Sequence, residues 1–319
     1  MNNKKYICTY FDYNYLPRGL ALYYSVKRFH KIFDFYVLTF DKQTYEYLSN
    51  LNEENLKLIS IDQYDAYFKT SADKFSDKKQ YYFSATPNIC LFLLKEYPEI
   101  DILLYLDADV YVFSSLEPLY EEFGDSSIGV CSHRVNPMLN FIAKHYGKYN
   151  VGVNLFRNSK TGLSCLTNWK NECETWYKGK PGYPLSFFSD QIFLDSWDVK
   201  YNELKVIHNI GVNTCYWNAG NYKFGKIDGQ YFVNNSPLMI FHFSSLIKET
   251  ETMWNTNSIY GLVSISGTLL EIYNYYICRI ESYGLNNIKR EKLNRKESLK
   301  KKIFSFVMKA FVNQKVIIK

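Results

Sequence analysis

The stretch DILLYLDADVYVFSS, from Asp101 to Ser115, says most about the fold of this 319-residue chain. Its first half is apolar, as expected of a buried strand, and two carboxylates, Asp107 and Asp109, follow where that strand should end. Charged groups rarely enter a protein core without a partner. The stretch therefore predicts a buried strand whose carboxyl end carries a functional acidic pair.

Strands and helices alternate on both sides of this stretch, which indicates an α/β domain with a mainly parallel sheet. Ligands of such sheets gather at the carboxyl ends of the strands. The expected strands cover residues 4–11, 33–40, 56–61, 101–106, 127–132, 149–157, 203–208 and 237–243. The expected helices cover residues 16–30, 41–51, 80–97, 161–177 and 188–197, and from about residue 258 the chain is expected to be helical to its end.

The composition is that of a globular protein, with 47% hydrophobic and 22% charged residues. Seven cysteines without a CxxC pair favour neither a disulfide framework nor a cysteine zinc site, and they fit a reducing compartment. The sequence shows neither a secretory signal at its start nor an apolar stretch of about 18 residues. A cytoplasmic protein is therefore expected.

Positive charge is concentrated at the C-terminal end. Residues 281–319 hold 11 of the 38 Lys and Arg residues but only 3 of the 32 Asp and Glu residues. Within this region Phe304, Val307, Met308 and Phe311 are spaced to share one helical face. A basic amphipathic helix of this kind is typical of segments that bind an anionic membrane surface, here at the inner face of the membrane. A solvated tail or a helix that packs on a protein partner is the alternative.

Asp107 and Asp109 lie two positions apart, so on extended backbone their side chains point the same way, with small Ala108 between them. Two like charges at one spot repel each other unless a cation lies between them. Mg²⁺ and Mn²⁺ prefer oxygen ligands, and Mg²⁺ usually leaves room for substrate phosphates. The pair predicts a metal site shared with a phosphorylated ligand, and a plain polar strand exit is the alternative.

Other classes of function fit the sequence less well. Phosphatases of the haloacid dehalogenase type also carry DxDx[TV] after a strand, but here Tyr111 takes the Thr/Val position and the motif lies far from the N-terminus. No nucleic-acid partner is expected, since neither a zinc finger nor an RNP signature is present. A catalytically inactive sugar-nucleotide-binding protein stays open as an alternative.

Five segments together resemble the GT-A nucleotide-sugar glycosyltransferases, and specifically the family-8-like retaining enzymes of bacterial lipopolysaccharide or capsule synthesis. They occur in the family's order and span residues 9–248. The segments are TYFDYNYLPRGLALYYS (9–25), LLYLDADVYVF (103–113), YNVGVNLFRNS (149–159), SFFSDQIFLDS (186–196) and MIFHFSSLIKE (239–249). The resemblance implies a GT-A catalytic domain over residues 1–255, a Rossmann-like sheet flanked by helices, and a C-terminal helical appendage over residues 256–319.

The resemblance also implies roles for single residues. Asp107, Asp109 and His242 match the ligands of Mn²⁺ (or Mg²⁺), and a neutral imidazole suits such a site. Lys248 matches a lysine that contacts the donor's diphosphate. The positions that match the rest of the nucleotide site are Thr9, Tyr10, Asp12, Tyr15, Asp107 and Ala108.

The sugar end of the site follows from the same resemblance. Asp190 and Gln191 match the catalytic positions and, with Asn150, surround the transferred sugar. HNIGVNTCYWNAGNY (208–222) also looks like a stretch of bacterial relatives, and its candidates for sugar or acceptor contacts are His208, Asn213, Trp217 and Asn218. The helix before Asp101 lacks an Arg that some members carry, and Lys78 and Lys79 are the candidate substitutes.

These matches imply the transfer of a hexose from a UDP-sugar to a carbohydrate or lipid-linked glycan acceptor, with retention of the anomeric configuration. A double displacement would need a nucleophile beneath the sugar, for which Asp190 and Gln191 are the matched residues. In a front-face route the leaving phosphate takes the proton of the acceptor. The sequence leaves both routes open.

Overall fold

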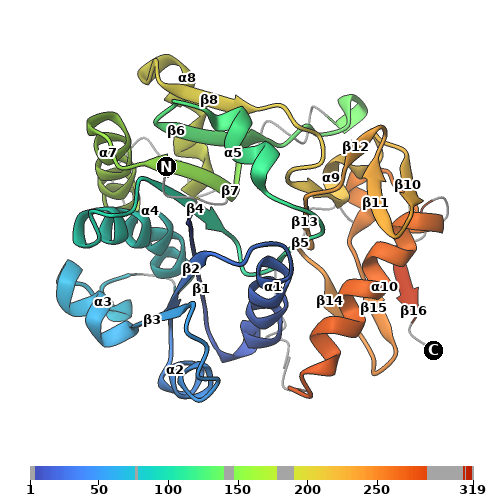
Figure 1. Ribbon diagram of the computed structural model, residues 1–319, viewed down its shortest axis with the longest axis horizontal. Helices are drawn as coiled ribbons and strands as arrows, with labels where there is room; N and C mark the ends of the chain where they lie inside the picture. Colours follow the sequence, from blue (N-terminus) through green and yellow to red (C-terminus); the bar gives the residue numbers. More distant parts are fainter. Residues whose placement is uncertain are drawn as a thin grey trace.

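The fold is described from a computed structural model of the chain (Figure 1). The structure describes residues 4–75, 78–139, 147–177, 190–285, 312 and 314–317. Among the described helices, none combines the length and the apolar composition that a bilayer span requires.

A seven-stranded sheet forms the centre of the molecule, in the order β3-β2-β1-β4-β7-β6-β8. Its strands are β1 (Lys5–Phe11), β2 (Phe33–Thr39), β3 (Leu56–Ser60), β4 (Ile102–Leu106), β6 (Ile128–Ser132), β7 (Tyr149–Arg157) and β8 (Leu204–Ile207). Neighbouring strands are parallel except that β7 runs antiparallel to both β4 and β6. The prediction of a mainly parallel α/β sheet is therefore confirmed.

Helices cover both faces of this sheet (Figure 1). Successive residues of β1 point to opposite faces, so that Tyr6 and Cys8 join one core while Ile7 and Phe11 join the other. The first core includes residues of α3, α4 and α7, and the second includes residues of α1, α2 and α5. The helices are α1 (Leu16–Phe29), α2 (Lys42–Ser49), α3 (Ile61–Phe68), α4 (Lys78–Glu96), α5 (Glu117–Phe123) and α7 (Lys160–Tyr177).

A smaller sheet lies beyond the carboxyl end of β4 and consists of β5 (Val110–Val112), β13 (Ile240–His242) and β9 (Thr214–Cys215). In this sheet His242 is the register partner of Val110. The N–H of Phe243 also donates to the carbonyl of Asp109 at 2.8 Å. This pairing brings a segment from late in the chain directly beside the acidic pair.

The C-terminal part of the described chain contains one long helix, α10 (Gly267–Ser282), that packs on α1. Ala21 of α1 and Tyr111 of β5 share a core with Ile272 and Tyr276 of α10. The remaining elements of this part are α8 (Trp197–Lys200), α9 (Tyr216–Ala219), β10 (Phe224–Ile227), β11 (Gln230–Val233), β12 (Ser236–Pro237), β14 (Ile247–Lys248), β15 (Met253–Asn255) and β16 (Lys315–Ile317).

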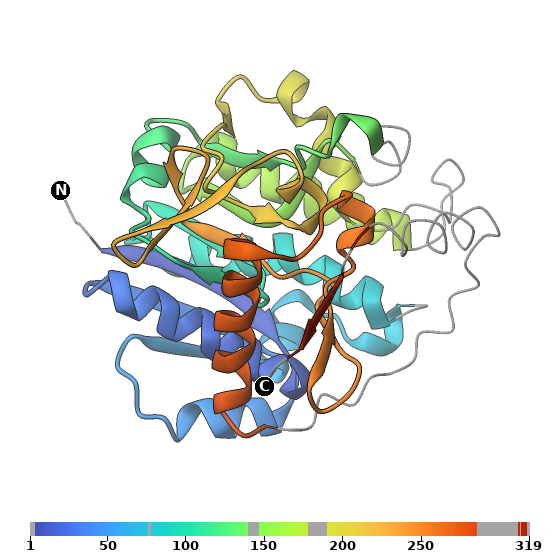
Figure 2. The same cartoon turned by 90° about the vertical axis from the view of Figure 1, so that its right-hand side faces the viewer.

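Two expectations for this part of the chain are wrong. Lys315–Ile317 is not helical but forms β16, which pairs antiparallel with β15, as Figure 2 shows beside the C-terminus. Residues 190–196 form a 3-10 helix, η4, before the short α8, in place of one α-helix. The amphipathic segment around Phe304–Phe311 lies outside the described residues, and the division of the chain at residue 255 stays a prediction.

Candidate functional site

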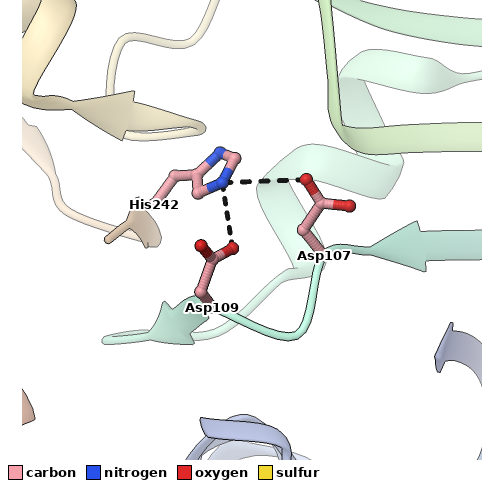
Figure 3. A group of neighbouring side chains, drawn as sticks. All are labelled: Asp107, Asp109 and His242. Atoms are coloured by element: carbon pink, nitrogen blue, oxygen red, sulfur yellow. Dashed lines mark ion pairs between the residues drawn. The ribbon is translucent and has the colours of Figure 1, made fainter. Parts of the chain in front are cut away.

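The acidic pair lies at the carboxyl end of β4, on a turn that leads into β5. The N–H of Asp107 donates to the carbonyl of Gly152 at 3.0 Å, and the N–H of Val110 donates back to the carbonyl of Asp107 at 3.2 Å. The backbone is therefore not extended here, contrary to the sequence argument. Both carboxylates nevertheless point toward His242, because the turn and the adjacent strand β13 fold them around it (Figure 3).

Asp107, Asp109 and His242 form a compact group of metal-binding side chains. One ligand atom from each lies within 4.8 Å of the other two. His242 Nε2 is 3.1 Å from Asp109 Oδ1 and 3.7 Å from Asp107 Oδ2 (Figure 3). Two carboxylate oxygens and an imidazole nitrogen that face one another suit a divalent ion such as Mn²⁺. This group could therefore bind a metal ion.

The three groups of this cluster shift one another's pKa. Burial raises the pKa of Asp107, and the charge of Asp109 adds to the rise while His242 opposes it. Burial acts the same way on Asp109, but the charge and hydrogen bond of His242, together with Arg18, hold its pKa below the ordinary value. Burial lowers the pKa of His242, yet the two carboxylates outweigh burial and raise it. The cluster is built to hold a positive charge between its carboxylates.

The ring of His242 is held on every side. Its Nδ1 lies 3.2 Å from Asn213 Oδ1, and Asn213 Nδ2 donates to Asn150 Oδ1 at 3.0 Å. That oxygen also accepts the N–H of Gly152 at 2.9 Å. A Cβ at Gly152 would lie 2.5 Å from His242 Nδ1, so only glycine fits here. The Asn213 bond keeps a proton on Nδ1, so Nε2, which faces the carboxylates, is the nitrogen that would bind a metal ion once its own proton is lost.

The predicted sugar-contact residues are engaged within the protein. Asn150, Asn213 and Asn218 are all buried. Asn218 accepts from the N–H of Cys215 and donates to two carbonyls, so its amide supports the turn that carries Asn213. Trp217 packs edge-on against His242 with ring centroids 5.3 Å apart, and its Nε1 has no partner among the described residues. Trp217 is thus the member of this stretch with a donor to offer, while sugar contact by the three asparagines stays a prediction.

Asp190 and Gln191 begin η4 and lie next to this network. Asp190 is 3% exposed, and its Oδ2 has no hydrogen-bond partner among the described residues. Burial raises the pKa of Asp190 well above its ordinary value, and the charge of Asp107 adds to the rise. Gln191 Oε1 lies 3.5 Å from Asn150 Nδ2. The structure thus brings both predicted catalytic residues close to the group of Asp107, Asp109 and His242.

The predicted nucleotide residues lie at the carboxyl end of β1, apart from Asp107, Ala108 and Lys248. Thr9 is fully buried with its hydroxyl unpartnered among the described residues, and the Tyr10 hydroxyl is 3.1 Å from Thr86 Oγ1. Asp12 accepts from the N–H groups of Asn14 and Tyr15. Tyr15 is 43% exposed, so its ring is open to a ligand, whereas Ala108 is 7% exposed.

Lys248 is not part of the metal group in this structure. Its Nζ lies 2.6 Å from Glu281 Oε1 of α10 and 5.7 Å from the centroid of the Trp254 ring. The three residues line a cavity of about 520 Å³ whose other described lining residues come from 249–251, 280 and 285. Asp107, Asp109 and His242 are not among them.

Other predicted residues lie away from the centre, and one important residue was missed. The side chains of Lys78 and Lys79 lie outside the described residues, and His208 is exposed. The missed residue is Tyr105, whose hydroxyl donates to Asp107 Oδ1 at 2.7 Å. Its place two residues before Asp107, on a strand that ends at the site, was the available signal.

Comparisons with known proteins agree with this fold. The sequence model of glycosyl transferase family 8 matches residues 6–197. A relative, the uncharacterized protein YfnD of Bacillus subtilis (strain 168), is 23% identical over 251 residues, which cover 79% of this chain and 80% of YfnD.

Two solved structures are similar to this chain at the level of the fold. The glycosyltransferase GlyE of Streptococcus pneumoniae TIGR4 has a TM-score of 0.50 and 16% identity, over 92% of this chain and 66% of GlyE. The bifunctional glycosyltransferase WbbM has a TM-score of 0.52 and 15% identity, over 89% of this chain and 51% of the WbbM chain.

Proposed function

The chain belongs to glycosyl transferase family 8 and is a glycosyltransferase of the GT-A fold; from that premise we propose that it transfers a hexose from a UDP-sugar to a carbohydrate acceptor, with retention of configuration. The observation that carries the proposal is the convergence of Asp107, Asp109 and His242 at the carboxyl end of β4. Such edges are where open α/β sheets bind their ligands.

The metal group is the site for the donor's diphosphate in this proposal. Asp107, Asp109 and His242 would hold Mn²⁺ or Mg²⁺, which supplies positive charge to stabilise the diphosphate as it departs. Tyr105 donates a hydrogen bond to Asp107 and keeps that carboxylate oriented. Asn213 does the same for His242 from the other side.

The nucleoside would bind where β1 ends and α1 begins. The exposed ring of Tyr15 offers a stacking surface, and the Asp12 carboxylate can accept hydrogen bonds from ribose hydroxyls or the base. Thr9 and Tyr10 precede this surface on β1, where Thr9 is buried and the Tyr10 hydroxyl contacts Thr86.

Lys248 completes the diphosphate site by changing its partner. In the structure its ammonium group is paired with Glu281, and both side chains are only partly buried. The ion pair of two partly exposed side chains is weak. A donor diphosphate can therefore compete with Glu281 for Lys248 and draw it toward the departing phosphates.

Asp190 and Gln191 would face the transferred sugar. The buried, high-pKa carboxyl of Asp190 is suited to a hydrogen bond with a sugar hydroxyl. A neutral carboxyl is a weaker nucleophile than a carboxylate, and an amide such as Gln191 is weaker still. We therefore favour the front-face route, in which the departing phosphate takes the acceptor's proton.

The acceptor side of the proposal rests on the sequence. A glycan in bacterial surface polysaccharide synthesis, carried on a lipid, would be met at the inner face of the membrane. The basic tail over residues 281–319 is suited to bind that anionic surface.

The proposal is tested by incubating the chain with a panel of nucleotide sugars that includes UDP-hexoses and measuring the release of the nucleoside diphosphate, with Mn²⁺ or with a chelator. We expect UDP release from one donor, dependent on Mn²⁺ or Mg²⁺, and saturation-transfer NMR should show contact with both the uracil and the sugar of that donor. Equal activity in chelator would contradict the metal dependence. Release from a different nucleotide sugar alone would contradict the UDP donor.

A further inference from the structure

Helix α1 carries a buried positive charge that the proposed mechanism has not yet used. Arg18 is 5% exposed, and its Nη2 donates to the carbonyl of Leu246 at 2.7 Å. Within the described part of the chain no carboxylate lies within ion-pair distance of its guanidinium. Arg18 is therefore a buried cation held mainly by a neutral carbonyl.

This placement is costly for three separate reasons. Burial removes the guanidinium from water without giving it a counter-ion. Its Nε donor has no acceptor among the described residues. Arg18 is also the third residue of α1, in the first turn, where the helix dipole disfavours a positive charge. Placements that break several such rules at once are expected at functional sites.

The surroundings of Arg18 indicate which function it serves. Its guanidinium carbon lies 4.8 Å from the centroid of the Tyr15 ring, at the predicted nucleotide end. Burial lowers the pKa of Arg18, but Tyr15, Tyr276 and Asp109 together raise it. The guanidinium therefore interacts electrostatically with Asp109, a member of the metal group. Leu246, its hydrogen-bond acceptor, belongs to the segment 243–248 that joins His242 to Lys248.

We propose that Arg18 is a positioning residue for the donor's diphosphate. Through the Leu246 carbonyl it holds segment 243–248 against the start of α1, with the metal ligand His242 before this segment and Lys248 at its end. Its charge interacts with that of Asp109 and adds to the positive potential that receives the phosphates. The inference rests on the proposed function and adds to it a residue outside the matched diphosphate positions.

The test compares ligands that differ only in phosphate content. Calorimetry in Mn²⁺ measures the Kd of UDP and of UMP for wild-type protein and Arg18→Met, which removes the charge but keeps the side chain's length. We expect the Kd of UDP to rise about tenfold or more, while the Kd of UMP changes less than twofold. Arg18→Lys, which keeps the charge, should recover part of the UDP affinity. The matched control is Arg28→Met, on the same helix, where the exposed guanidinium contacts the Tyr275 hydroxyl.

The results separate this role from a merely structural one. Equal weakening of UDP and UMP, or unchanged UDP affinity in Arg18→Met, overturns the proposal. If thermal melting shows that Arg18→Met does not fold, Arg18→Lys is used in the same comparison of UDP with UMP. Equal weakening of UDP and UMP binding in Arg18→Lys then overturns the proposal. A wild-type protein that binds no UDP would instead overturn the proposed function, and this inference with it.

Discussion

His242, the expected metal ligand, and Lys248, the expected contact of the diphosphate, are held in opposite ways although only six residues separate them. His242 is 3% exposed and is fixed by Asn213, by the close backbone of Gly152 and by Trp217. Within the described part of the chain Lys248 has one ion pair, to Glu281, and about a quarter of its side chain is exposed.

In the proposed site, the difference separates a preorganised half from an adjustable half. A metal ligand must be oriented before the ion arrives, and neighbouring hydrogen bonds supply that orientation. A group that receives a substrate can begin on another partner and exchange it. In this chain the rigid half is made of strand ends and buried amides, and the adjustable half lies on the short strand β14 beside α10.

The largest expected effect comes from removing a ligand of the rigid half. Asp109→Asn should lower hexose transfer by on the order of 10²–10³-fold, because one charged oxygen of the metal group is lost. Steady-state kinetics with saturating Mn²⁺ measures it, and Asp125→Asn, an exposed aspartate, is the control. Activity within threefold of wild type in Asp109→Asn would show that this group does not serve the reaction.

The next effect tests the orientation of His242 without touching a ligand. Asn213→Ser removes the acceptor for His242 Nδ1 and should weaken Mn²⁺ binding by about 10–100-fold. Electron paramagnetic resonance of free Mn²⁺ measures the affinity independently of catalysis. Asn221→Ser, whose wild-type amide bonds the Arg134 carbonyl at 2.7 Å, is the matched control. Equal Mn²⁺ affinity in both variants would mean that the ring needs no such support.

A smaller effect of opposite sign is expected in the adjustable half. Glu281→Gln removes the competitor for Lys248, and a partly exposed ion pair is worth up to about 1 kcal/mol. UDP affinity should therefore rise by roughly threefold, most clearly at low salt. The control is Glu271→Gln, since Glu271 lies on α10 like Glu281 and its exposed ion pair is with Lys226 of β10. If UDP binds Glu281→Gln more weakly than wild type, Glu281 supports the donor site instead of competing with it.

The rigid half of the site was largely foreseeable from the sequence. An apolar run that ends in Asp107-Ala108-Asp109 marks a buried strand and its functional end, and the family resemblance added His242. The sequence could not show the turn at Ala108 or the bond from Tyr105, because both depend on how the chain folds back after the strand. It also could not show that Asn213 faces His242, since 29 residues separate them.

The adjustable half was much less visible. The partner of Lys248 lies on α10, 33 residues further along the chain, and only the packing of α10 on α1 brings it near. Arg18 reads as an ordinary helical arginine until the fold buries it and places Leu246, 228 residues away, at its Nη2. Long-range contacts between short segments leave no periodic signal in a sequence.

The smallest expected effect concerns the free energy of unfolding, which the buried carboxyl of Asp190 lowers when it loses its proton. Because burial raises its folded-state pKa, the folded state binds a proton more tightly than the unfolded state, and stability falls as the pH rises through the folded-state pKa. Asp190→Asn removes this loss. The melting temperature of the variant should match that of wild type near pH 4 and exceed it by a few degrees toward pH 8, since about 1 kcal/mol corresponds to roughly 2–4 °C. Asp198→Asn is the control of opposite sign. In the wild type the hydrogen bond from Lys148 lowers the pKa of Asp198, so this bond stabilises the protein at pH values above the unfolded-state pKa of Asp198. A constant difference between wild type and Asp190→Asn across the range would show that Asp190 is charged when folded, and the front-face preference would then lose its support.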